Sequence, residues 1–329
     1  MSKMDQIQAP VADDMAKFQG HFKSAMRTEV PLLDRVTRYI IRRKGKQMRP
    51  LFVFLTARVV LGKEMSILPE RSHVAASLIE LLHTATLVHD DVVDESPMRR
   101  GFFSIQALWK KKVAVLVGDY LLSRGLLMAV DAEAYALLRI TSEAVRQMSE
   151  GELLQIEKAR RLDITEEVYF DIIQRKTASL IAACCACGAA SVSDEKEVIQ
   201  NMKRFGELVG LAFQIKDDLL DLGDGERIGK PTGGDIRERK MTLPLIHTLN
   251  MATASERRRL IRLVKYQNHK DHAVQEVMDA IIDGPGMDYA RQKMTELRDE
   301  AMALLEAAPD TKAKTALIDL VDYTIERKR

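Results

Sequence analysis

The sequence has 329 residues, of which 50 are Lys or Arg and 48 are Asp or Glu, so 30% of the chain is charged while the formal net charge is only +2. This balance argues against a general nucleic-acid-binding surface, and a hydrophobic content of 46% argues against intrinsic disorder. The 9 prolines and 17 glycines are too few for a β architecture rich in turns. Length and composition therefore favour one large helical body.

The two ends of the chain show the least regular pattern. Residues 1–11 lack the apolar core of a secretion signal, and we expect them to be flexible. A single all-α domain is expected over residues 12–326, followed by a basic, solvated tail at 327–329. No apolar run approaches the roughly 18 to 20 residues that a membrane span needs. We therefore expect a cytoplasmic protein with at most peripheral membrane contact.

Apolar residues recur at three- and four-residue spacing through most of the chain, as at Leu153 and Ile156. No proline interrupts this pattern between Pro97 and Pro231. The pattern predicts about ten or more helices packed in a single bundle.

Basic residues stand in pairs at two places. Lys46 and Arg49 lie close together, and Arg99 and Arg100 are adjacent. Arginine forks suit phosphate oxygens, and lysine acts on them as a point charge. Each pair alone is typical of an ordinary surface, so its meaning depends on the acidic residues nearby.

Two segments carry the same arrangement of three aspartates, each at the end of an apolar run. They are Asp90, Asp91 and Asp94 in the first segment and Asp217, Asp218 and Asp221 in the second. In a helix the outer two of each set lie one turn apart on the same face, where carboxylates repel one another unless a cation binds. A single set would be typical of a solvated helix end, but the repetition disfavours that interpretation. Neither set contains a His or Cys, and aspartates without such ligands favour Mg²⁺, which commonly bridges carboxylates to substrate phosphates.

His83 lies seven residues before Asp90, two helical turns back on the same face. It could therefore donate a hydrogen bond to a phosphate at the same site. The alternative is a core histidine whose hydrogen bonds are satisfied internally.

Two further segments have a simpler interpretation. Cys184, Cys185 and Cys187 lie together in an apolar stretch, as expected of small buried side chains in a reducing compartment. The glycine-rich joint over residues 223–235 predicts a loop or lid beside the second aspartate segment.

Taken in order, these motifs resemble those of trans-isoprenyl diphosphate synthases of the long-chain polyprenyl type. The resemblance runs from about residue 12 to the C-terminus. It rests on Gly45–Pro50, His83–Gly101, Gly118–Tyr120, Lys176–Thr177, Phe213–Asp221, Gly229–Lys230, Asp235 and Lys240–Pro244. Arg239 departs from the pattern, because the family commonly has glycine before the last motif lysine, and the local turn is expected to differ there.

The resemblance implies a role for each matched residue. Mg²⁺ would be bound by Asp90, Asp94 and Asp217, with Asp91, Asp218 and Asp221 in support. Isopentenyl diphosphate would contact Lys46, Arg49, His83 and Arg100. The allylic diphosphate would contact Arg99, Lys176, Thr177, Gln214, Lys230 and Lys240, of which Lys176, Thr177, Gln214 and Lys230 would act in catalysis.

The implied fold is an isoprenoid-synthase-type helical bundle around a central cavity, and the implied assembly is a homodimer. The implied reaction is ionisation of an allylic diphosphate, condensation with successive isopentenyl diphosphate units and loss of a proton, giving a long all-trans polyprenyl diphosphate, such as a quinone side chain requires. In short-chain members, bulky aromatic residues before the first aspartates close the product tunnel. Here Ala85 and Thr86 stand at those positions, with Leu82 and Met128 deeper, which favours a long product.

The nearest alternative is a medium-chain synthase of the geranylgeranyl type, which shares the same chemistry. A class I terpene cyclase is disfavoured because its second metal site usually mixes Asn, Ser and Glu, and a non-catalytic partner subunit because it would usually lose aspartates. A di-iron bundle would need Glu-x-x-His motifs on two helices, and no such motif occurs around the second cluster.

Overall fold

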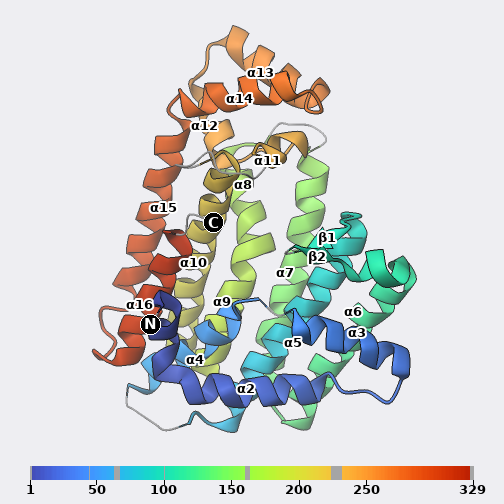
Figure 1. Ribbon diagram of the computed structural model, residues 1–329. Helices are drawn as coiled ribbons and strands as arrows, with labels where there is room; N and C mark the ends of the chain where they lie inside the picture. The colour runs from blue at the N-terminus through green and yellow to red at the C-terminus, as the bar shows by residue number, and fades with distance from the viewer. Residues whose placement is uncertain are drawn as a thin grey trace. The chain divides into compact units, whose positions relative to one another are not determined.

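The computed structural model describes residues 2–43, 45–62, 67–99, 101–159, 164–223 and 232–326. Helices dominate these residues, and the strands among them are limited to one short antiparallel hairpin (Figure 1). The prediction of an all-α fold with more than ten helices is confirmed for this part of the chain.

The chain divides into two compact units, each assembled from three stretches of chain. The first unit contains Met1–Val145, Ala183–Lys203 and Ala307–Leu317. The second unit contains Arg146–Ala182, Arg204–Glu306 and Ile318–Arg329. Most of the boundaries fall inside continuous helices, namely α7 (Tyr135–Ala159), α9 (Ser179–Ala190), α10 (Lys196–Asp221) and α16 (Lys312–Ile325). A boundary within a helix has no linker composition to mark it, so this division could not be predicted from the sequence.

The first unit contains the N-terminal helices and the first aspartate segment. The elements that lie wholly within it are α1 (Lys3–Gln8), the 3₁₀ turn η1 (Ala9–Val11), α2 (Ala12–Ala25), α3 (Pro31–Arg42), α4 (Met48–Leu61), α5 (Glu70–Val93), β1 (Met98–Arg99), β2 (Phe102–Phe103) and α6 (Ile105–Asp131). The second unit adds α8 (Glu166–Ile173), the π-helical turn η2 (Gln174–Ala178), α11 (Gly234–Arg237), α12 (Leu243–Met251), α13 (Ala254–Tyr266), α14 (Asp271–Ile282) and α15 (Gly286–Ala303).

The N-terminus differs from the flexible segment predicted over residues 1–11. Ser2 and Asp5 form a capping box that starts α1, in which each side chain accepts a hydrogen bond from the other residue's backbone N–H. Ile7 and Val11, one turn apart, are both buried. The capped turn and these two apolar side chains explain why the segment is helical.

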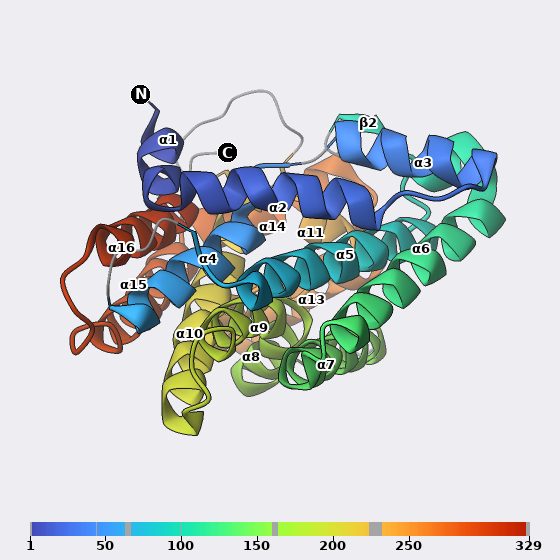
Figure 2. The ribbon, with the colours of Figure 1, turned by 90° about the horizontal axis from the view of Figure 1, so that it is seen from below.

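Helices α5 and α6 run side by side in both ribbon views (Figures 1 and 2). Glycines on α6 allow this close approach. A Cβ added to Gly125 would lie 3.3 Å from the Leu78 side chain, and one added to Gly118 would lie only 2.1 Å from Nε2 of His89. The end of α5 that carries the first aspartates is therefore held tightly against α6.

Helix α6 is more apolar than expected, since the sequence analysis found no run long enough for a membrane span. It is the one helix among the described residues that is long and apolar enough, by length and composition alone, to cross a membrane. Asp119 and Arg124 are the only charged residues between Val113 and Val130, and they interrupt an otherwise apolar run. Only 33% of the apolar stretch is buried, so α6 presents an exposed hydrophobic face.

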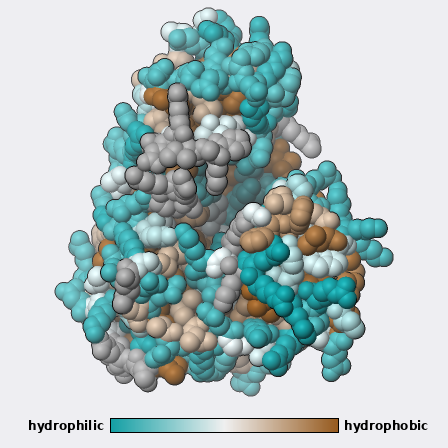
Figure 3. Space-filling view, in the orientation of Figure 1, coloured by the Kyte–Doolittle hydropathy of each residue, from teal (hydrophilic) through white to brown (hydrophobic). Residues whose placement is uncertain are grey.

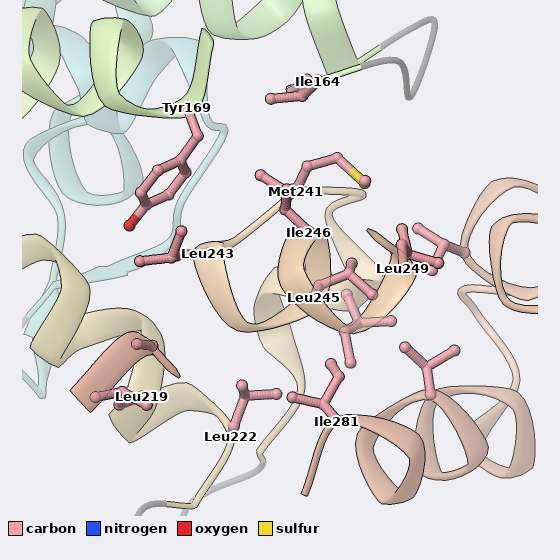
Figure 4. Close-up of a cluster of buried hydrophobic side chains, with 14 of the residues drawn as sticks. Ile164, Tyr169, Leu219, Leu222, Met241, Leu243, Leu245, Ile246, Leu249 and Ile281 are labelled. Carbon is pink, nitrogen blue, oxygen red and sulfur yellow. The ribbon is translucent and has the colours of Figure 1, made fainter. Parts of the chain in front are cut away.

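A hydrophobic cluster joins the helices of the second unit (Figure 4). Leu219 and Leu222 at the end of α10 belong to it, together with Leu243 at the start of α12. The buried ring of Tyr169 from α8 also belongs to this cluster. Leu219 and Leu222, which stand among the aspartates of the second segment, thus anchor that segment in the core of the unit.

The three cysteines of α9 are free thiols, and all three are buried, as the sequence predicts. Burial raises the pKa of Cys185 to about 12 and raises those of Cys184 and Cys187 as well. The thiols are therefore protonated at neutral pH and contribute packing.

Candidate active site

The predicted site residues divide between the two units, and each half has its own geometry. In the first unit, Asp90 is exposed on the last turn of α5, and Asp94 is the exposed residue that ends the helix. The Asp94 backbone N–H donates to the Asp90 carbonyl at 2.8 Å, so the two carboxylates are one turn apart as predicted. Asp91 points inward and is buried.

Asp91 fixes the chain that follows α5. Its Oδ1 accepts a hydrogen bond from Nε of Arg99 in β1, and its backbone carbonyl accepts one from the Gln106 amide. Burial raises the pKa of the Asp91 carboxyl, and the Arg99 guanidinium opposes that rise. Asp91 thus holds the side chain of Arg99 against the last turn of α5.

A small pocket of about 110 Å³ gathers several of the predicted phosphate-binding residues. His83, Asp91 and Arg99 line it, together with Gly45 of the basic motif. Lys46 lies nearby in sequence but outside a helix, because Gln47 takes a left-handed conformation with φ 52° and α4 begins only at Met48. Arg49 lies in the first turn of α4, and Arg100 lies outside the described residues.

His89 is a residue that the sequence analysis missed. Its ring occupies the space above Gly118, with Nε2 3.1 Å from the Val115 carbonyl oxygen and 3.5 Å from Oδ1 of Asp119. His89 directly precedes Asp90 on α5, and its imidazole therefore links this end of α5 to α6. The motif that contains Gly118 and Asp119 was noted in the sequence, but only the structure gives it a contact to the aspartates' helix.

The predicted chain-length residues lie mainly in the interior of the first unit. Ala85 and Leu82 are buried, and Leu82 lies against Gly125 of α6. Thr86 is half-buried and donates its hydroxyl to the His83 carbonyl at 2.9 Å. Met128 on α6 is half-buried.

In the second unit, a chain of hydrogen bonds orders two of the predicted catalytic residues. The Thr177 hydroxyl donates to Oε1 of Gln214 at 2.8 Å, and Nε2 of Gln214 donates to Oδ1 of Asp218 at 3.0 Å. The hydroxyl of Tyr169 donates to the other oxygen, Oδ2 of Asp218, at 2.7 Å. The carboxylate therefore sets the orientation of the Gln214 amide, and the amide oxygen sets that of the Thr177 hydroxyl.

Asp218 is the buried centre of this chain. Burial raises its pKa to about 7, although the hydrogen bonds from Gln214 and Tyr169 oppose the rise. Its neighbour Asp217 is half-buried. The sequence did not indicate Tyr169, because nothing in the spacing of a tyrosine 49 positions away from Asp218 shows that they meet.

Lys176 and Thr177 lie in the π-helical turn η2, a type of turn that occurs often at functional sites. Nζ of Lys176 lies 2.5 Å from a carboxylate oxygen of Glu152 and 3.3 Å from Oε1 of Gln155. These two residues of α7 hold the ammonium group at a defined position.

Asp221 has a structural task. Its two carboxylate oxygens accept hydrogen bonds from the backbone N–H groups of Gly234 and Asp235, at 3.1 and 3.0 Å. Its carbonyl accepts from Gly233 at 2.9 Å. Asp221 thereby fixes the start of α11 to the end of α10. Residues 224–231 of the predicted loop, which include Lys230, lie outside the described residues.

Lys240 lies after α11, with Nζ 2.6 Å from Glu238 and 3.3 Å from Asp235. Burial lowers the pKa of Lys240, but the two carboxylates outweigh it, so the net change is upward. Lys240 is therefore a cation at neutral pH. Arg239 before it has a φ of 59°, the left-handed conformation that glycine adopts most easily.

The carboxylates fit a hard cation held partly by substrate. Among the described residues, no group of three or more His, Cys, Asp or Glu side chains forms a ready metal site. Mg²⁺ does not require such a cage, since it commonly takes one or two carboxylates and completes its shell with water and phosphate oxygens. Asp90 and Asp94 in the first unit, and Asp217 in the second, are the residues to which the sequence resemblance assigns that task.

Comparison with known proteins shows the family of the chain. A family model described as Polyprenyl synthetase matches residues 30–281. The chain belongs to this family. It is therefore a prenyltransferase, and the resemblance found in the sequence is confirmed.

Relatives and solved structures cover essentially the whole chain. The octaprenyl diphosphate synthase of Escherichia coli is 37% identical over 328 residues, which are 99% of each chain. The crystal structure of a decaprenyl diphosphate synthase from Rhodobacter capsulatus has a TM-score of 0.91 and 34% identity, and the match covers 99% of both chains. A polyprenyl synthase from Caulobacter crescentus, complexed with calcium and isoprenyl diphosphate, has a TM-score of 0.89 and 31% identity over 99% of this chain and 98% of that one.

Proposed function

We propose that this protein is a Mg²⁺-dependent synthase that extends an allylic prenyl diphosphate with successive isopentenyl diphosphate units to a long all-trans polyprenyl diphosphate. The observation that carries this proposal is the ordered chain Thr177–Gln214–Asp218, which stands beside the carboxylate of Asp217 and the cation Lys176. Its oxygen dipoles are oriented, and its neighbours in the sequence are groups that would bind a diphosphate. The relatives named octaprenyl and decaprenyl diphosphate synthase support the long-chain assignment.

The two halves would act on the two substrates. In the first unit, Lys46, Arg49, His83 and Arg100 would bind isopentenyl diphosphate. Arg99 of the first unit and Lys176, Lys230 and Lys240 of the second would bind the allylic diphosphate. Asp90, Asp94 and Asp217 would hold Mg²⁺, which supplies positive charge to the departing diphosphate when it is bound. A relative complexed with calcium and isoprenyl diphosphate supports this combination of cation and ligand.

Cleavage of the carbon–oxygen bond leaves negative charge on the diphosphate and an allylic carbocation. Lys176 and Lys240 are preorganised for the negative charge, because carboxylates already hold both ammonium groups in place. The oxygens of Thr177 and Gln214 present dipoles to the carbocation. Their hydrogen bonds fix them in one orientation, so neither approaches it as a free nucleophile.

The double bond of isopentenyl diphosphate then attacks the carbocation, and a proton leaves the new tertiary cation. As in the family, the departed diphosphate would take this proton, so we assign no side chain as general base. The product grows by repetition of the cycle. Ala85 and Thr86, small residues one turn before the first aspartates, leave room for it, and Leu82 and Met128 lie farther along the same path.

We further propose a cytoplasmic homodimer that uses the hydrophobic face of α6. Leu116 and Leu127 on this face are 58% and 51% exposed. Leucines gathered on one exposed helix face are typical of a surface that binds another protein. A second copy of the chain would bury them. Analytical ultracentrifugation of the purified protein tests this assembly, with a Leu116→Glu variant expected to shift it to the monomer.

The test of the reaction is incorporation of labelled isopentenyl diphosphate into products that extract into solvent after acid treatment or phosphatase. We expect incorporation to require an allylic primer and Mg²⁺ and to stop on addition of EDTA. Asp90→Asn and Asp217→Asn should each lower the rate on the order of 100-fold or more, because each removes a ligand for the cation. Asp13→Asn, an exposed aspartate of α2, is the matched control and should leave the rate unchanged. Equal rates in all three variants would refute the proposal.

A further inference from the structure

Helix α3 of the first unit presents a row of arginines to solvent. Arg35, Arg38 and Arg42 are exposed and follow one another at spacings of three and four, so they share one face of the helix. Arg38 pairs with Asp34 at 2.8 Å. Within the part of the chain that the structure describes, Arg35 and Arg42 make no ion pair or hydrogen bond. The face therefore carries an excess of positive charge.

Aromatic residues bind this face of α3 to the β1–β2 hairpin and α6. The Tyr39 hydroxyl donates to the Phe103 carbonyl at 2.6 Å, and the Tyr39 ring packs edge-on against Trp109 at 5.2 Å. The Arg43 guanidinium lies 4.0 Å from the centre of the Tyr39 ring and 3.9 Å from that of Phe102. We call this region the α3 surface; it is an open pocket of about 490 Å³ lined by Arg35, Arg38, Tyr39, Arg42, Arg43, Phe102 and Trp109.

Hydrophobic side chains border the arginines. Phe102 and Phe103 on the hairpin are 47% and 58% exposed, and Met98 opposite them in the hairpin and Leu32 in the first turn of α3 are each 47% exposed. The space-filling view shows hydrophobic surface over the hairpin and the adjoining start of α6, next to hydrophilic side chains over α3 (Figure 3). Exposed aromatic residues beside a row of arginines are typical of segments that lie in a membrane interface.

We propose that the α3 surface docks on an anionic phospholipid bilayer. The arginines would bind the lipid phosphates, and Phe102 and Phe103 would enter the headgroup region. This inference rests on the proposed function for its purpose, because a long polyprenyl diphosphate has an apolar chain that water does not dissolve. Docking would bring the enzyme to the only phase that accepts such a product.

Charge complementarity decides between lipid and other occupants. Both the arginines and the exposed phenylalanines find a partner in a bilayer, whereas a small diphosphate would use only the arginines. The same pocket residues Phe102 and Arg43 also border the smaller pocket with His83 and Arg99, so a docked bilayer would lie beside one half of the candidate active site.

Co-sedimentation of the full chain with vesicles tests this proposal without any substrate. The protein should bind vesicles of phosphatidylcholine with phosphatidylglycerol, bind pure phosphatidylcholine weakly, and dissociate as salt is raised. The triple variant Arg35→Gln, Arg38→Gln, Arg42→Gln should lose affinity on the order of 100-fold, since each basic residue near an anionic surface contributes several-fold. Phe102→Ser combined with Phe103→Ser should also weaken binding.

The matched control removes three exposed arginines from α13 in the second unit, as Arg257→Gln, Arg258→Gln, Arg262→Gln. It changes the net charge equally and should bind vesicles as the unmodified protein does. The proposal is overturned if the unmodified protein fails to bind anionic vesicles, if the α3 variant binds them normally, or if the α13 variant is weakened as much as the α3 variant.

Prenyl transfer in vesicle-free solution separates this proposal from the proposed function. The α3 arginine variant should keep the solution rate and the KM for isopentenyl diphosphate. A raised KM with normal vesicle binding would assign the arginines to substrate capture and overturn docking. Vesicle binding in a protein that transfers no prenyl group would instead refute the proposed function and leave the α3 surface in place.

Discussion

Single hydroxyl groups organise the second half of the candidate site. Tyr169 donates its hydrogen bond to one oxygen of Asp218 and leaves the other oxygen for the Gln214 amide. Tyr169 is therefore a positioning residue. Its effect on the reaction passes through a buried carboxylate, where a lost hydrogen bond is not replaced by bulk water.

Tyr169→Phe should lower kcat about 10-fold with a smaller effect on the KM for the allylic substrate, because it loosens the groups that face the carbocation. The fraction of allylic diphosphate hydrolysed to alcohol should rise, since water then competes with isopentenyl diphosphate. Steady-state kinetics and product analysis, made well below the melting temperature, measure both effects.

Tyr289→Phe is the matched control for that change. It also removes a hydroxyl that donates to a carboxylate, that of Glu166 at 2.6 Å, but Tyr289 lies on α15 outside the chain of Thr177 and Gln214. Its kinetics should stay unchanged. If Tyr169→Phe lowered only the melting temperature, as a purely structural hydroxyl would, the positioning role would be wrong.

Arg239 gives a prediction about stability. It is exposed and takes a φ of 59°, which costs a residue with a side chain about 1–2 kcal/mol. Arg239→Gly should therefore raise the free energy of unfolding by about 1 kcal/mol, after part of that gain is offset by the freedom glycine has in the unfolded chain. Arg258→Gly, within the regular helix α13, should lower it by about the same amount. Urea unfolding compares the two, and a loss of stability in both would contradict the account.

This residue also shows where the sequence comparison needed the structure. The departure from the family's glycine suggested a different turn, but the arginine adopts the left-handed conformation that suits glycine. The pattern could identify the position, whereas only the backbone shows that its conformation is left-handed.

At the scale of elements, the π-helical turn η2 depends on glycines in its neighbours. A Cβ on Gly151 of α7 would lie 2.7 Å from the Lys176 backbone nitrogen, and one on Gly210 of α10 would lie 2.5 Å from the Ala178 Cα. Both contacts are with backbone atoms, which cannot turn aside as a side chain can. The two glycines allow helices to approach the turn that carries Lys176 and Thr177.

Gly210→Ala should reduce the free energy of unfolding by about 1–3 kcal/mol, as expected of overpacking in a tight contact. The control is Gly20→Ala in α2, where an added Cβ meets no atom within 4 Å. That change should stabilise the protein by about 0.5–1 kcal/mol, since alanine favours a helix more than glycine does. Thermal and urea unfolding distinguish the opposite signs; a Gly210→Ala protein as stable as Gly20→Ala would rule out the proposed close packing.

Helix ends could be predicted from the sequence, but contacts between elements could not. Both aspartate segments stand at the ends of long helices, α5 and α10, as the apolar runs before them predict. The partners of these aspartates had no such signal. Asp91 meets Arg99, Asp218 meets Tyr169 and Asp221 meets the backbone of α11, because tertiary packing sets these contacts.

For the whole molecule, the near-zero net charge is a sum of separate regions with opposite charge. Carboxylates gather at the ends of α5 and α10, while arginines gather on α3. Composition alone could exclude a general anion-binding protein but could not locate these regions. The apolar stretch of α6 was likewise not evident from overall composition, because Asp119 and Arg124 interrupt the run of apolar residues between Val113 and Val130.

Product length is a property of the whole enzyme that one residue of α5 should control. Ala85 is fully buried, and Ala85→Phe should shorten the product by obstructing the path beyond the first aspartates. Ala85→Leu introduces a smaller side chain, which disturbs folding less than phenylalanine does, and should give a product of intermediate length. Ala16→Phe, on the exposed face of α2, should leave the length unchanged. Chromatography of the dephosphorylated products measures these lengths, and an unchanged length in both Ala85 variants would contradict the assignment.

The most direct measurement is the size of the product made by the unmodified protein. Purified protein is incubated with labelled isopentenyl diphosphate, an allylic primer and Mg²⁺, and the dephosphorylated alcohols are separated by length. We predict all-trans alcohols longer than geranylgeraniol. Products that stop at geranylgeraniol would establish a medium-chain enzyme, and cyclic hydrocarbons or no incorporation at all would contradict the proposed chain elongation.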